Sequence, residues 1–359
     1  MTVARRPTIL ITGGAGFVGS NLALRLKRDL PDHDVTALDN LRRRGAELAL
    51  PRLKAGGVAF RHGDIRNTED LADAGAFDLL IECSAEPSVH AGYDGNPAYL
   101  VNTNLTGTVN CLEAARRHGA ALVFLSTSRV YPINPLRNLP LERRDNRLSI
   151  AAEAAGPGWS ASGIGTDFPL RGSRSLYGAT KLASELLIEE YGALYGLRAV
   201  VNRCGVLTGP WQMGKVDQGF VVLWAARHLY GGSLAYSGFG GKGHQVRDLL
   251  HVDDLYDLVR RQIDGMDRFQ GTVFNVGGGL DVSVSLAELT EACVRRAGRR
   301  IGIAANPATQ PADIPWYVTD NAAVSAATGW HPRRSVDIVL DDIFRWLTDN
   351  RAILEPVLR

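Results

Sequence analysis

A tyrosine and a lysine four residues apart, Tyr177 and Lys181, have the types and the spacing that acid–base chemistry needs. In a helix this i, i+4 spacing places both side chains on one face. A phenol titrates near ~10 and is a poor base at neutral pH, but a neighbouring ammonium favours the phenolate and tunes the pair toward neutral pH. Thr127, which follows an apolar run, could hydrogen-bond the same substrate oxygen. The plain alternative is a helix-surface pair with a solvated charge, because Y-x-x-x-K often occurs by chance.

Strands and helices alternate through the first half of the chain, which implies a parallel sheet with helices on both faces. In this arrangement Tyr177 and Lys181 start a helix that comes after the strand ending at Thr127. The sequence therefore predicts an α/β fold, a doubly wound parallel sheet of the Rossmann type. The predicted strands are 58–62, 76–83, 121–126 and 199–202, and the predicted helices are 104–118 and 176–195.

The stretch from Thr8 to Asp39 predicts a dinucleotide site at the start of this sheet. An apolar strand at 9–11 is followed at once by G-x-x-G-x-x-G, from Gly13 to Gly19, and by an amphipathic helix over 17–30. Glycines permit a tight turn, and the amides and dipole of the helix start favour an anionic pyrophosphate. A glycine-rich turn without a ligand is the alternative, and the order of the parts favours binding.

Asp39 ends the second predicted strand, where an acid suits the hydroxyls of an adenine ribose. It would repel a 2′-phosphate, so the sequence predicts NAD rather than NADP, although Arg42, Arg43 and Arg44 could weaken that preference. Asp64 follows the next strand and could reach the adenine amine, or it could be a simple turn acid.

A second, smaller unit of mixed α/β structure is expected to hold the substrate. Beyond Arg203 the strict alternation weakens, and a long irregular segment, 132–174, precedes Tyr177. We assign residues 1–203, with 248–276 returning, to an NAD-binding Rossmann domain. Residues 204–247 and 277–359 then form the substrate-binding subdomain.

The composition excludes several classes of partner. The 359 residues carry a net charge of +2, which gives no electrostatic case for nucleic acid or a membrane surface, and no apolar run is long enough to span a bilayer. Four scattered cysteines have no metal-type spacing and indicate reduced thiols in a cytoplasmic protein. No metal site is expected.

The chain resembles the extended short-chain dehydrogenase/reductase superfamily, the nucleotide-sugar epimerases and dehydratases, over essentially its whole length. The resemblance is carried by TGGAGFVGSN (12–21), LDN (38–40), GDIRN (63–67), NLTGTVNCLEAAR (104–116), STSRVY (126–131), YGATK (177–181) and RDLLHVDDL (247–255).

This resemblance implies tightly bound NAD that is recycled, a substrate carrying a nucleoside diphosphate, and a catalytic triad of Thr127, Tyr177 and Lys181. The 4,6-dehydratases of the superfamily place an Asp-Glu pair directly after the triad Ser/Thr, where this chain has Ser128 and Arg129. Arginine is no general base near neutral pH, so dehydration is disfavoured. Cofactor binding is expected from Gly13, Gly16, Phe17, Val18, Asp39, Asn40, Asp64, Ile65, Ser84, Ala85, Asn104, Ser126, Tyr177 and Lys181.

Within the superfamily the chain is most similar to the 2-epimerases of CDP-hexoses, the CDP-paratose/CDP-tyvelose type. DNLRRRGA (39–46), HGDIRN (62–67), VDQGF (216–220), GFGGKGHQVRDLLHVDD (238–254) and FNVGGG (274–279) carry this likeness. It implies inversion at C2 through a transient 2-keto sugar. The alternatives are a UDP-hexose 4-epimerase or another nucleotide-sugar epimerase using the same triad, and a non-catalytic NAD-binding regulator.

Substrate contacts are expected around the triad. The guanidinium of Arg247 suits a pyrophosphate, with a surface pair to Asp248 as the alternative. Family relatives often dimerise through two helices per subunit, here 104–118 and 176–195, so a homodimer is expected. The predicted substrate-binding residues are Glu86, His90, Thr127, Arg203, Gln218 and Arg247.

Overall fold

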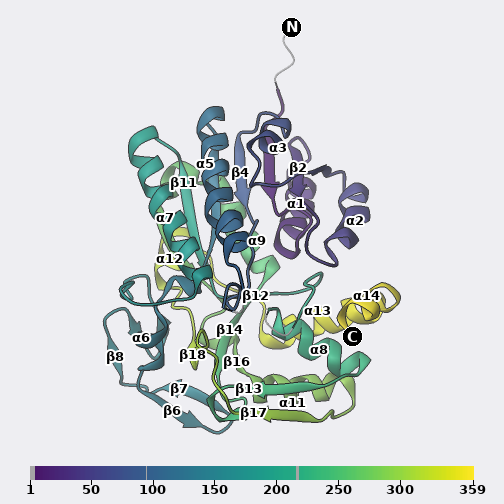
Figure 1. Ribbon diagram of the computed structural model, residues 1–359, viewed down its shortest axis with the longest axis vertical. Helices are drawn as coiled ribbons and strands as arrows, with labels where there is room; N and C mark the ends of the chain where they lie inside the picture. Colours follow the sequence, from purple (N-terminus) through teal and green to yellow (C-terminus); the bar gives the residue numbers. More distant parts are fainter. Residues whose placement is uncertain (1–4, 94, 216–217) are drawn as a thin grey trace. The chain divides into compact units, whose positions relative to one another are not determined.

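The computed structural model describes residues 5–93, 95–215 and 218–359. The contacts divide the chain into two compact units, each built from several segments (Figure 1). The first unit comprises 1–127, 176–202 and 256–273, and the second comprises 128–175, 203–255 and 274–359.

A seven-stranded sheet with the order β15-β11-β5-β4-β1-β2-β3 is the centre of the first unit. The pairs from β3 through β2, β1 and β4 to β5 are parallel, as predicted. The elements are β1 (Thr8–Thr12), α1 (Phe17–Asp29), β2 (Asp34–Asp39), α2 (Leu50–Ala55), β3 (Ala59–His62), α3 (Thr68–Asp73), β4 (Leu79–Glu82), α4 (Ala98–Val101), α5 (Gly107–His118), β5 (Ala121–Thr127), α7 (Leu176–Tyr195), β11 (Ala199–Cys204), α9 (Val252–Asp264), α10 (Met266–Phe269) and β15 (Thr272–Val276).

Helices α5 and α7 pack side by side over one face of this sheet (Figure 1). All seven residues of β5 are buried, as a central parallel strand covered on both faces requires. Leu80 and Leu122 of the strands, Leu112 of α5 and Ile188 of α7 belong to one buried apolar cluster. Burial of this layer fixes the helix that carries Tyr177 against the strand that ends in Thr127.

The second unit contains a four-stranded sheet in which β14 pairs with β12, β16 and β18. Helix α8 packs on α11, α13 and α14. The elements of this unit are α6 (Ile133–Arg137), β6 (Leu141–Arg144), β7 (Arg147–Ile150), β8 (Ala155–Gly156), β9 (Trp159–Ser160), β10 (Gly163–Ile164), β12 (Val206–Thr208), α8 (Phe220–Tyr230), β13 (Leu234–Ser237), β14 (Val246–His251), β16 (Ser283–Ser285), α11 (Leu286–Ala297), β17 (Ile303–Asn306), β18 (Trp316–Tyr317), α12 (Ala322–Thr328), α13 (Val336–Asp349) and α14 (Arg351–Leu358).

The division into units differs from the expected domain boundaries at four places, which are 128–175, 203, 248–255 and 274–276. The irregular segment 128–175 groups with the second unit, where Arg147 pairs with Glu288 at 3.5 Å and the Leu148 amide donates to the His244 carbonyl. Residues 248–255 also belong there, because β14 pairs only with strands of that unit. The assignment of one unit to NAD and the other to substrate stays a prediction.

Other features of the described chain concern cysteines and helix length. The four cysteines are unbridged. In the described ranges, no helix combines the length and the apolar character needed to cross a bilayer.

A buried histidine in the second unit predicts a pH dependence of stability. His228 of α8 is fully buried, its Nδ1 lies 2.8 Å from the Trp224 carbonyl oxygen, and its Nε2 has no hydrogen-bond partner among the described residues. Burial lowers the pKa of this imidazole below its usual 6.5. The unfolded chain therefore binds a proton at a pH where the folded chain does not. The free energy of unfolding should fall as the pH drops below 6.5, by up to about 1.4 kcal/mol per pH unit from this group.

The measurement is urea unfolding at pH 7.5, 6.5 and 5.5 for the wild type and for His228→Gln. The amide of glutamine can donate to the Trp224 carbonyl but does not titrate, so the acid slope should be shallower in the variant. His331→Gln, at an exposed histidine, serves as the control. Equal slopes in all three proteins would contradict the prediction.

Candidate active site

The glycine turn between β1 and α1 has the conformation expected of a phosphate-binding loop. Gly13 has a positive φ of 64°, and a Cβ there would lie 2.8 Å from the backbone of Cys83 and Ser84. A Cβ at Gly19 would overlap the Gly13 carbonyl oxygen. Gly16 caps α1 without any side-chain hydrogen bond, and the first turn has no acidic residue. The positive end of the helix is therefore uncompensated by side chains, which fits an anionic group.

Asp39 connects the end of β2 to this turn. Its Oδ2 accepts a hydrogen bond from the Ala15 amide at 3.1 Å, and its Oδ1 accepts one from the Leu41 amide at 2.8 Å. Burial raises the pKa of this carboxyl group above its usual value. The acid thus holds the glycine turn in place, at the strand end where the ribose contact is predicted.

Asp64 is tied to protein groups rather than left open. Arg66 donates to both of its carboxylate oxygens, at 2.9 and 2.6 Å, and Asn40 Nδ2 donates to Oδ2 at 2.8 Å. The hydrogen bonds from Arg66 lower the pKa of Asp64 to about 2. Asp64 therefore orients the side chain of Asn40. Its predicted contact with adenine would have to use lone pairs of the carboxylate oxygens that these hydrogen bonds leave open.

Arg66 and Tyr99 were not singled out in the sequence, although the structure places them beside these residues. The guanidinium of Arg66 lies 4.9 Å from the centre of the Tyr99 ring, and that of Arg42 lies 3.9 Å from it. Arg66 belongs to the GDIRN motif, and its positive charge two residues after Asp64 could have indicated in the sequence that the two side chains pair. Tyr99 carries no local signal, because only the fold brings it to this strand end.

Asn104 clamps the loop that follows β4. Its Oδ1 accepts from the Glu86 amide at 2.7 Å, and its Nδ2 donates to the Glu86 carbonyl at 3.0 Å. It lies in a π-helical turn, Asn102–Thr106, ahead of α5, and such turns are frequent at functional sites. Asn104 thus ties this turn to the backbone of Glu86, and its predicted role in cofactor binding stays a prediction.

Glu86 and His90 lie in the same loop. Glu86 Oε1 accepts from the Ser88 amide at 3.3 Å, and Ser88 Oγ accepts from the His90 amide at 3.3 Å. The His90 ring lies 6.4 Å from that of Tyr93. Their predicted contacts with the sugar stay predictions. Ile65, by contrast, is buried against Gly107, and its predicted contact with the cofactor stays a prediction.

The three predicted triad residues come from β5 and α7, which pack on each other. Thr127 is the last residue of β5, and Tyr177 and Lys181 lie in the first turns of α7 with at most 9% of their surface exposed. The Lys181 ammonium lies 4.0 Å from the centre of the Phe124 ring. Ser126 Oγ donates to the buried Glu185 carboxylate, which ties the two elements together. Tyr177 and Lys181 are therefore no solvated surface pair.

Arg203, in the second unit, is held by an aromatic hydroxyl. Its Nη1 donates to the Tyr131 hydroxyl at 3.2 Å, and Tyr131 in turn donates to Asn275 Oδ1 at 2.8 Å. Both side chains are buried. Arg203, at the end of β11, is thus hydrogen-bonded inside the protein through Tyr131. The predicted substrate contact of Arg203 stays a prediction.

Arg247, also in the second unit, donates only to carbonyl oxygens. Its partners are Val246 at 2.7 Å and Ile314 at 2.6 Å. Burial, with repulsion from Arg129, lowers the pKa of this guanidinium to about 9. The alternative of a pair with Asp248 is not seen in the described structure, since the buried Asp248 carboxylate accepts from the Gly279 and Thr319 amides. An anionic ligand would relieve this uncompensated charge.

Gln218 has a defined backbone contact. Its amide donates to the Lys215 carbonyl at 3.1 Å, and the Lys215 amide donates back at 2.7 Å. Residues 216 and 217 of the VDQGF stretch lie outside the described residues. Elsewhere in the described ranges, no group of three or more His, Cys, Asp or Glu side chains could hold a metal ion.

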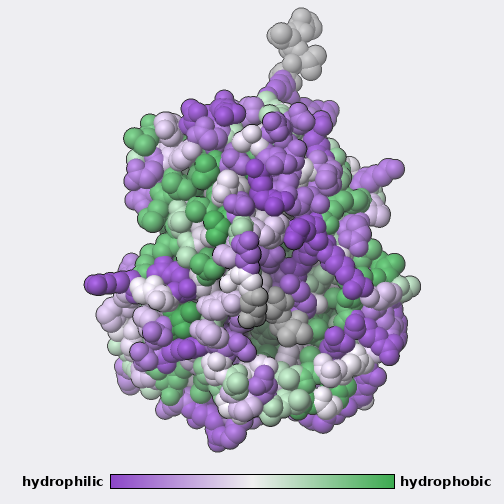
Figure 2. Space-filling model, viewed as in Figure 1, coloured by the Kyte–Doolittle hydropathy of each residue, from purple (hydrophilic) through white to green (hydrophobic). Residues whose placement is uncertain are grey.

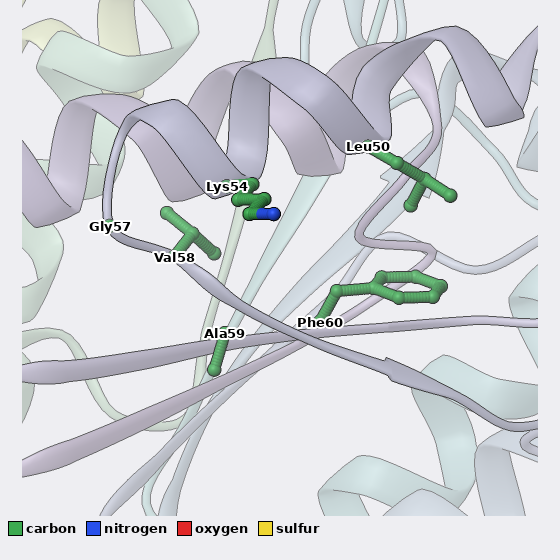
Figure 3. Close-up of a pocket in the computed structure, with 6 residues that line it drawn as sticks. All are labelled: Leu50, Lys54, Gly57, Val58, Ala59 and Phe60. Carbon is green, nitrogen blue, oxygen red and sulfur yellow. The ribbon is translucent and has the colours of Figure 1, made fainter.

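A hollow in the first unit is separate from this chemistry (Figure 3). It lies between α2 and the start of β3, whereas Asp64 follows the carboxyl end of that strand. Its lining is mostly apolar, and its one charged group is the ammonium of Lys54, with no carboxylate, imidazole or phenol among the lining side chains. The lining residues are Leu50, Lys54, Gly57, Val58, Ala59 and Phe60.

Comparisons with known proteins identify relatives along the whole chain. The sequence pattern of the NAD dependent epimerase/dehydratase family matches residues 9–277. The chain is 29% identical over 347 residues to CDP-paratose 2-epimerase of Salmonella typhi, covering 94% of this chain and 98% of that protein. It is 32% identical over 257 residues to dTDP-glucose 4,6-dehydratase of Mycobacterium tuberculosis, covering 71% of this chain and 68% of that protein.

A solved structure supports the same relationship. A double mutant of dTDP-glucose 4,6-dehydratase from Streptomyces venezuelae, with NAD bound, superposes with a TM-score of 0.78 and 27% identity. The match covers 98% of this chain and 99% of that one. By their names, these relatives include an epimerase and dehydratases of nucleotide sugars.

Proposed function

Because the chain belongs to the NAD-dependent epimerase/dehydratase family, we propose that it is a nucleotide-sugar epimerase that inverts C2 of a CDP-hexose. NAD is the cofactor of this family, and the uncompensated start of α1 and the glycine turn fit its pyrophosphate. The finer assignment draws on the 29% identity to CDP-paratose 2-epimerase over nearly the whole of both chains.

In the proposed reaction Tyr177 takes the proton of the sugar hydroxyl at C2, and Thr127 hydrogen-bonds the same oxygen. Lys181 stabilises the phenolate by its charge. When bound, NAD would supply the redox chemistry at C2, as acceptor and then donor of the hydride. If the 2-keto sugar presents its other face before Tyr177 returns the proton, C2 is inverted without net oxidation.

The single observation that favours epimerisation over dehydration is the pair that follows Thr127. Water elimination needs an acid and a base next to the keto sugar, and this chain has Ser128 and Arg129 there. Arg129 donates to the Ala312 carbonyl at 3.2 Å, which makes it a cation held on a loop rather than a proton carrier. The tyrosine, lysine and threonine needed for oxidation are all present.

Arg247 supports a substrate with a diphosphate. Its charge is half-buried and faces the repulsion of Arg129; Asp313 and Asp248 attract it, but its hydrogen bonds within the described chain go to carbonyl oxygens. A diphosphate oxygen would replace the weaker neutralisation by two carbonyl groups. This argument favours a nucleoside diphosphate but does not distinguish its base.

The test is to incubate the purified protein with CDP-, UDP-, GDP- and dTDP-hexoses and to locate any inverted carbon by NMR. We expect turnover of a CDP-hexose with inversion at C2, and mass spectrometry of released small molecules should show NAD. Inversion at C4 of a UDP-hexose would replace the proposal by the 4-epimerase alternative. A 4-keto-6-deoxy product would make the protein a dehydratase, and no turnover of any of these sugars would favour the NAD-binding regulator.

We also propose that the protein forms a homodimer through α5 and α7. Large apolar side chains on α7 are exposed, and apolar surface gathers over this part of the first unit (Figure 2). Burial of such a patch in an interface is favourable. The exposed residues are Leu176, Leu186, Leu194 and Tyr195.

A further inference from the structure

A glutamate lies inside the apolar layer between the sheet and helices α5 and α7. Glu82 is the last residue of β4 and has no exposed surface. It is in register with Thr12 of β1 and with Phe124 of β5. Residues in register on parallel strands point to the same face of the sheet, and Phe124 carries the Lys181 ammonium over its ring. Glu82 therefore lies next to the site that holds Lys181.

The contacts of Glu82 indicate its protonation state. Its Oε1 lies 2.5 Å from Thr108 Oγ1, and the same Oγ1 lies 2.9 Å from the carbonyl oxygen of Asn104. A hydroxyl has one proton, and a carbonyl can only accept. The single proton of Thr108 cannot serve both acceptors fully; when Thr108 donates to Asn104, the short contact with Glu82 is a hydrogen bond if Glu82 donates to Thr108. A carboxylic acid in place of a carboxylate satisfies this chain.

The second oxygen of Glu82 supports the same state. Oε2 is buried and has no hydrogen-bond partner among the described residues. A carboxylate would leave half of its charge there without a donor, which is costly in an apolar layer. Burial accordingly raises the pKa of Glu82 above its usual value.

The charged and titratable groups that face Glu82 come from two helices. Lys181 of α7 attracts a carboxylate at this position, and it is the one cation that acts on Glu82 among the described groups. Cys111 of α5 is fully buried, and burial raises its pKa well above the usual value. Glu185 of α7 accepts from Ser126 on the same face of β5. From the strands, Thr12 and Phe124 do not titrate.

We propose that Glu82 is a positioning residue for the Tyr177–Lys181 pair. Glu82 carries its own proton in the resting protein and so does not compete with the Tyr177 phenolate for the charge of Lys181. The inference rests on the proposed function, in which these two residues move the substrate proton. Through Thr108, the same proton also anchors the π-helical turn of Asn104, which clamps the Glu86 loop.

The proposal has a signature on the alkaline side. When the pH is high enough to ionise Glu82, a carboxylate forms beside Lys181 and shares its charge. The attraction of Lys181 for the Tyr177 phenolate then weakens, the phenol keeps its proton, and turnover falls. A glutamine has the same size and can donate to Thr108 but never ionises. The alkaline limb of the rate profile should therefore move upward by about one pH unit in Glu82→Gln, while the acidic limb coincides with that of the wild type.

The direct test is an infrared difference spectrum of the NAD-bound protein without sugar, wild type minus Glu82→Gln. We expect the C=O stretch of a protonated carboxylic acid at neutral pH, which disappears as the pH is raised. This measurement needs no turnover, so it decides the state of Glu82 even if no nucleotide sugar is a substrate. Absence of the band, or a carboxylate band in its place, would overturn the proposal.

Two further measurements keep the test decisive. Thr108→Val removes the acceptor of the acid proton and should shift the same infrared band, whereas Thr108→Ser should not; an unmoved band in Thr108→Val would overturn the proposal if Glu82→Gln does not fold. For the rate profile, Glu189→Gln serves as the matched control, because it removes an exposed charge from α7, the helix that carries Tyr177 and Lys181. A downward shift of the acidic limb in Glu82→Gln would show that the acid was ionised at rest.

Discussion

Replacing Tyr177 by phenylalanine is expected to lower turnover of the nucleotide sugar by about 1,000-fold while NAD stays bound. Phenylalanine keeps the ring that α7 buries but lacks the oxygen that takes the sugar proton. Proton transfer by a positioned side chain contributes roughly 100- to 10,000-fold, so the loss should appear in kcat. The measurements are turnover by NMR of the sugar and NAD content per chain by mass spectrometry.

The matched control is Tyr195→Phe, at the exposed end of the same helix. Its ring packs against Tyr191, and loss of its hydroxyl should leave turnover within about twofold. Melting temperatures of both variants should match that of the wild type, which separates lost chemistry from lost folding. Wild-type turnover in Tyr177→Phe would end the proposed mechanism.

The sequence was sufficient for those parts of the fold whose signals are local. The helix predicted over 176–195 has the same bounds in the structure, and the glycine turn leads into a helix at Phe17 as expected. Turn chemistry and apolar periodicity act over a few residues, so they can be recognised without knowledge of the partners. The parallel pairing of β1, β2, β4 and β5 is what the alternation of strands and helices predicts.

The segments whose unit differs from the expected division depend on distant pairing. Residues 248–255 were expected to return to the nucleotide-binding core, whereas β14 pairs with strands from 206–208, 283–285 and 316–317. The segment 128–175 is likewise assigned by contacts with residues more than 70 positions away, such as the bridge between Ile164 and Thr319. No local property of these residues specifies such partners.

The pairing of individual polar atoms at the site could not be predicted from the sequence. Asp64 was expected either to reach the adenine amine or to be a simple turn acid, and in the structure Arg66, two residues later, donates to both of its oxygens. Asn104 was predicted as a cofactor contact, and its amide is used on the backbone of Glu86. The sequence predicted which residues meet at the strand ends. Which of their polar atoms are already paired depends on the three-dimensional packing.

The glycine turn provides the second large expected effect. Gly19→Ala adds a Cβ that would overlap the backbone carbonyl of Gly13, and a backbone atom cannot rotate away as a flexible side chain can. The turn must move, and the amides at the start of α1 move with it. Lost hydrogen bonds to a charged pyrophosphate are worth about 3 kcal/mol, so NAD should bind about 100-fold more weakly. The overpacking itself should lower the free energy of unfolding by about 1–3 kcal/mol.

The NAD content of the purified variant and its dissociation constant by titration measure the first effect, and urea unfolding measures the second. Gly192→Ala is the control, because it lies inside α7 and its Cβ would make an ordinary contact 3.5 Å from the Leu197 carbonyl oxygen. Alanine favours a helix over glycine, so this variant should be as stable as the wild type or up to about 1 kcal/mol more stable. If Gly19→Ala retained full NAD with unchanged affinity, the pyrophosphate would have to bind elsewhere than at this turn. In that case the proposed oxidation of the sugar at Tyr177 would lose its basis, since the glycine turn is the anchor proposed for the cofactor.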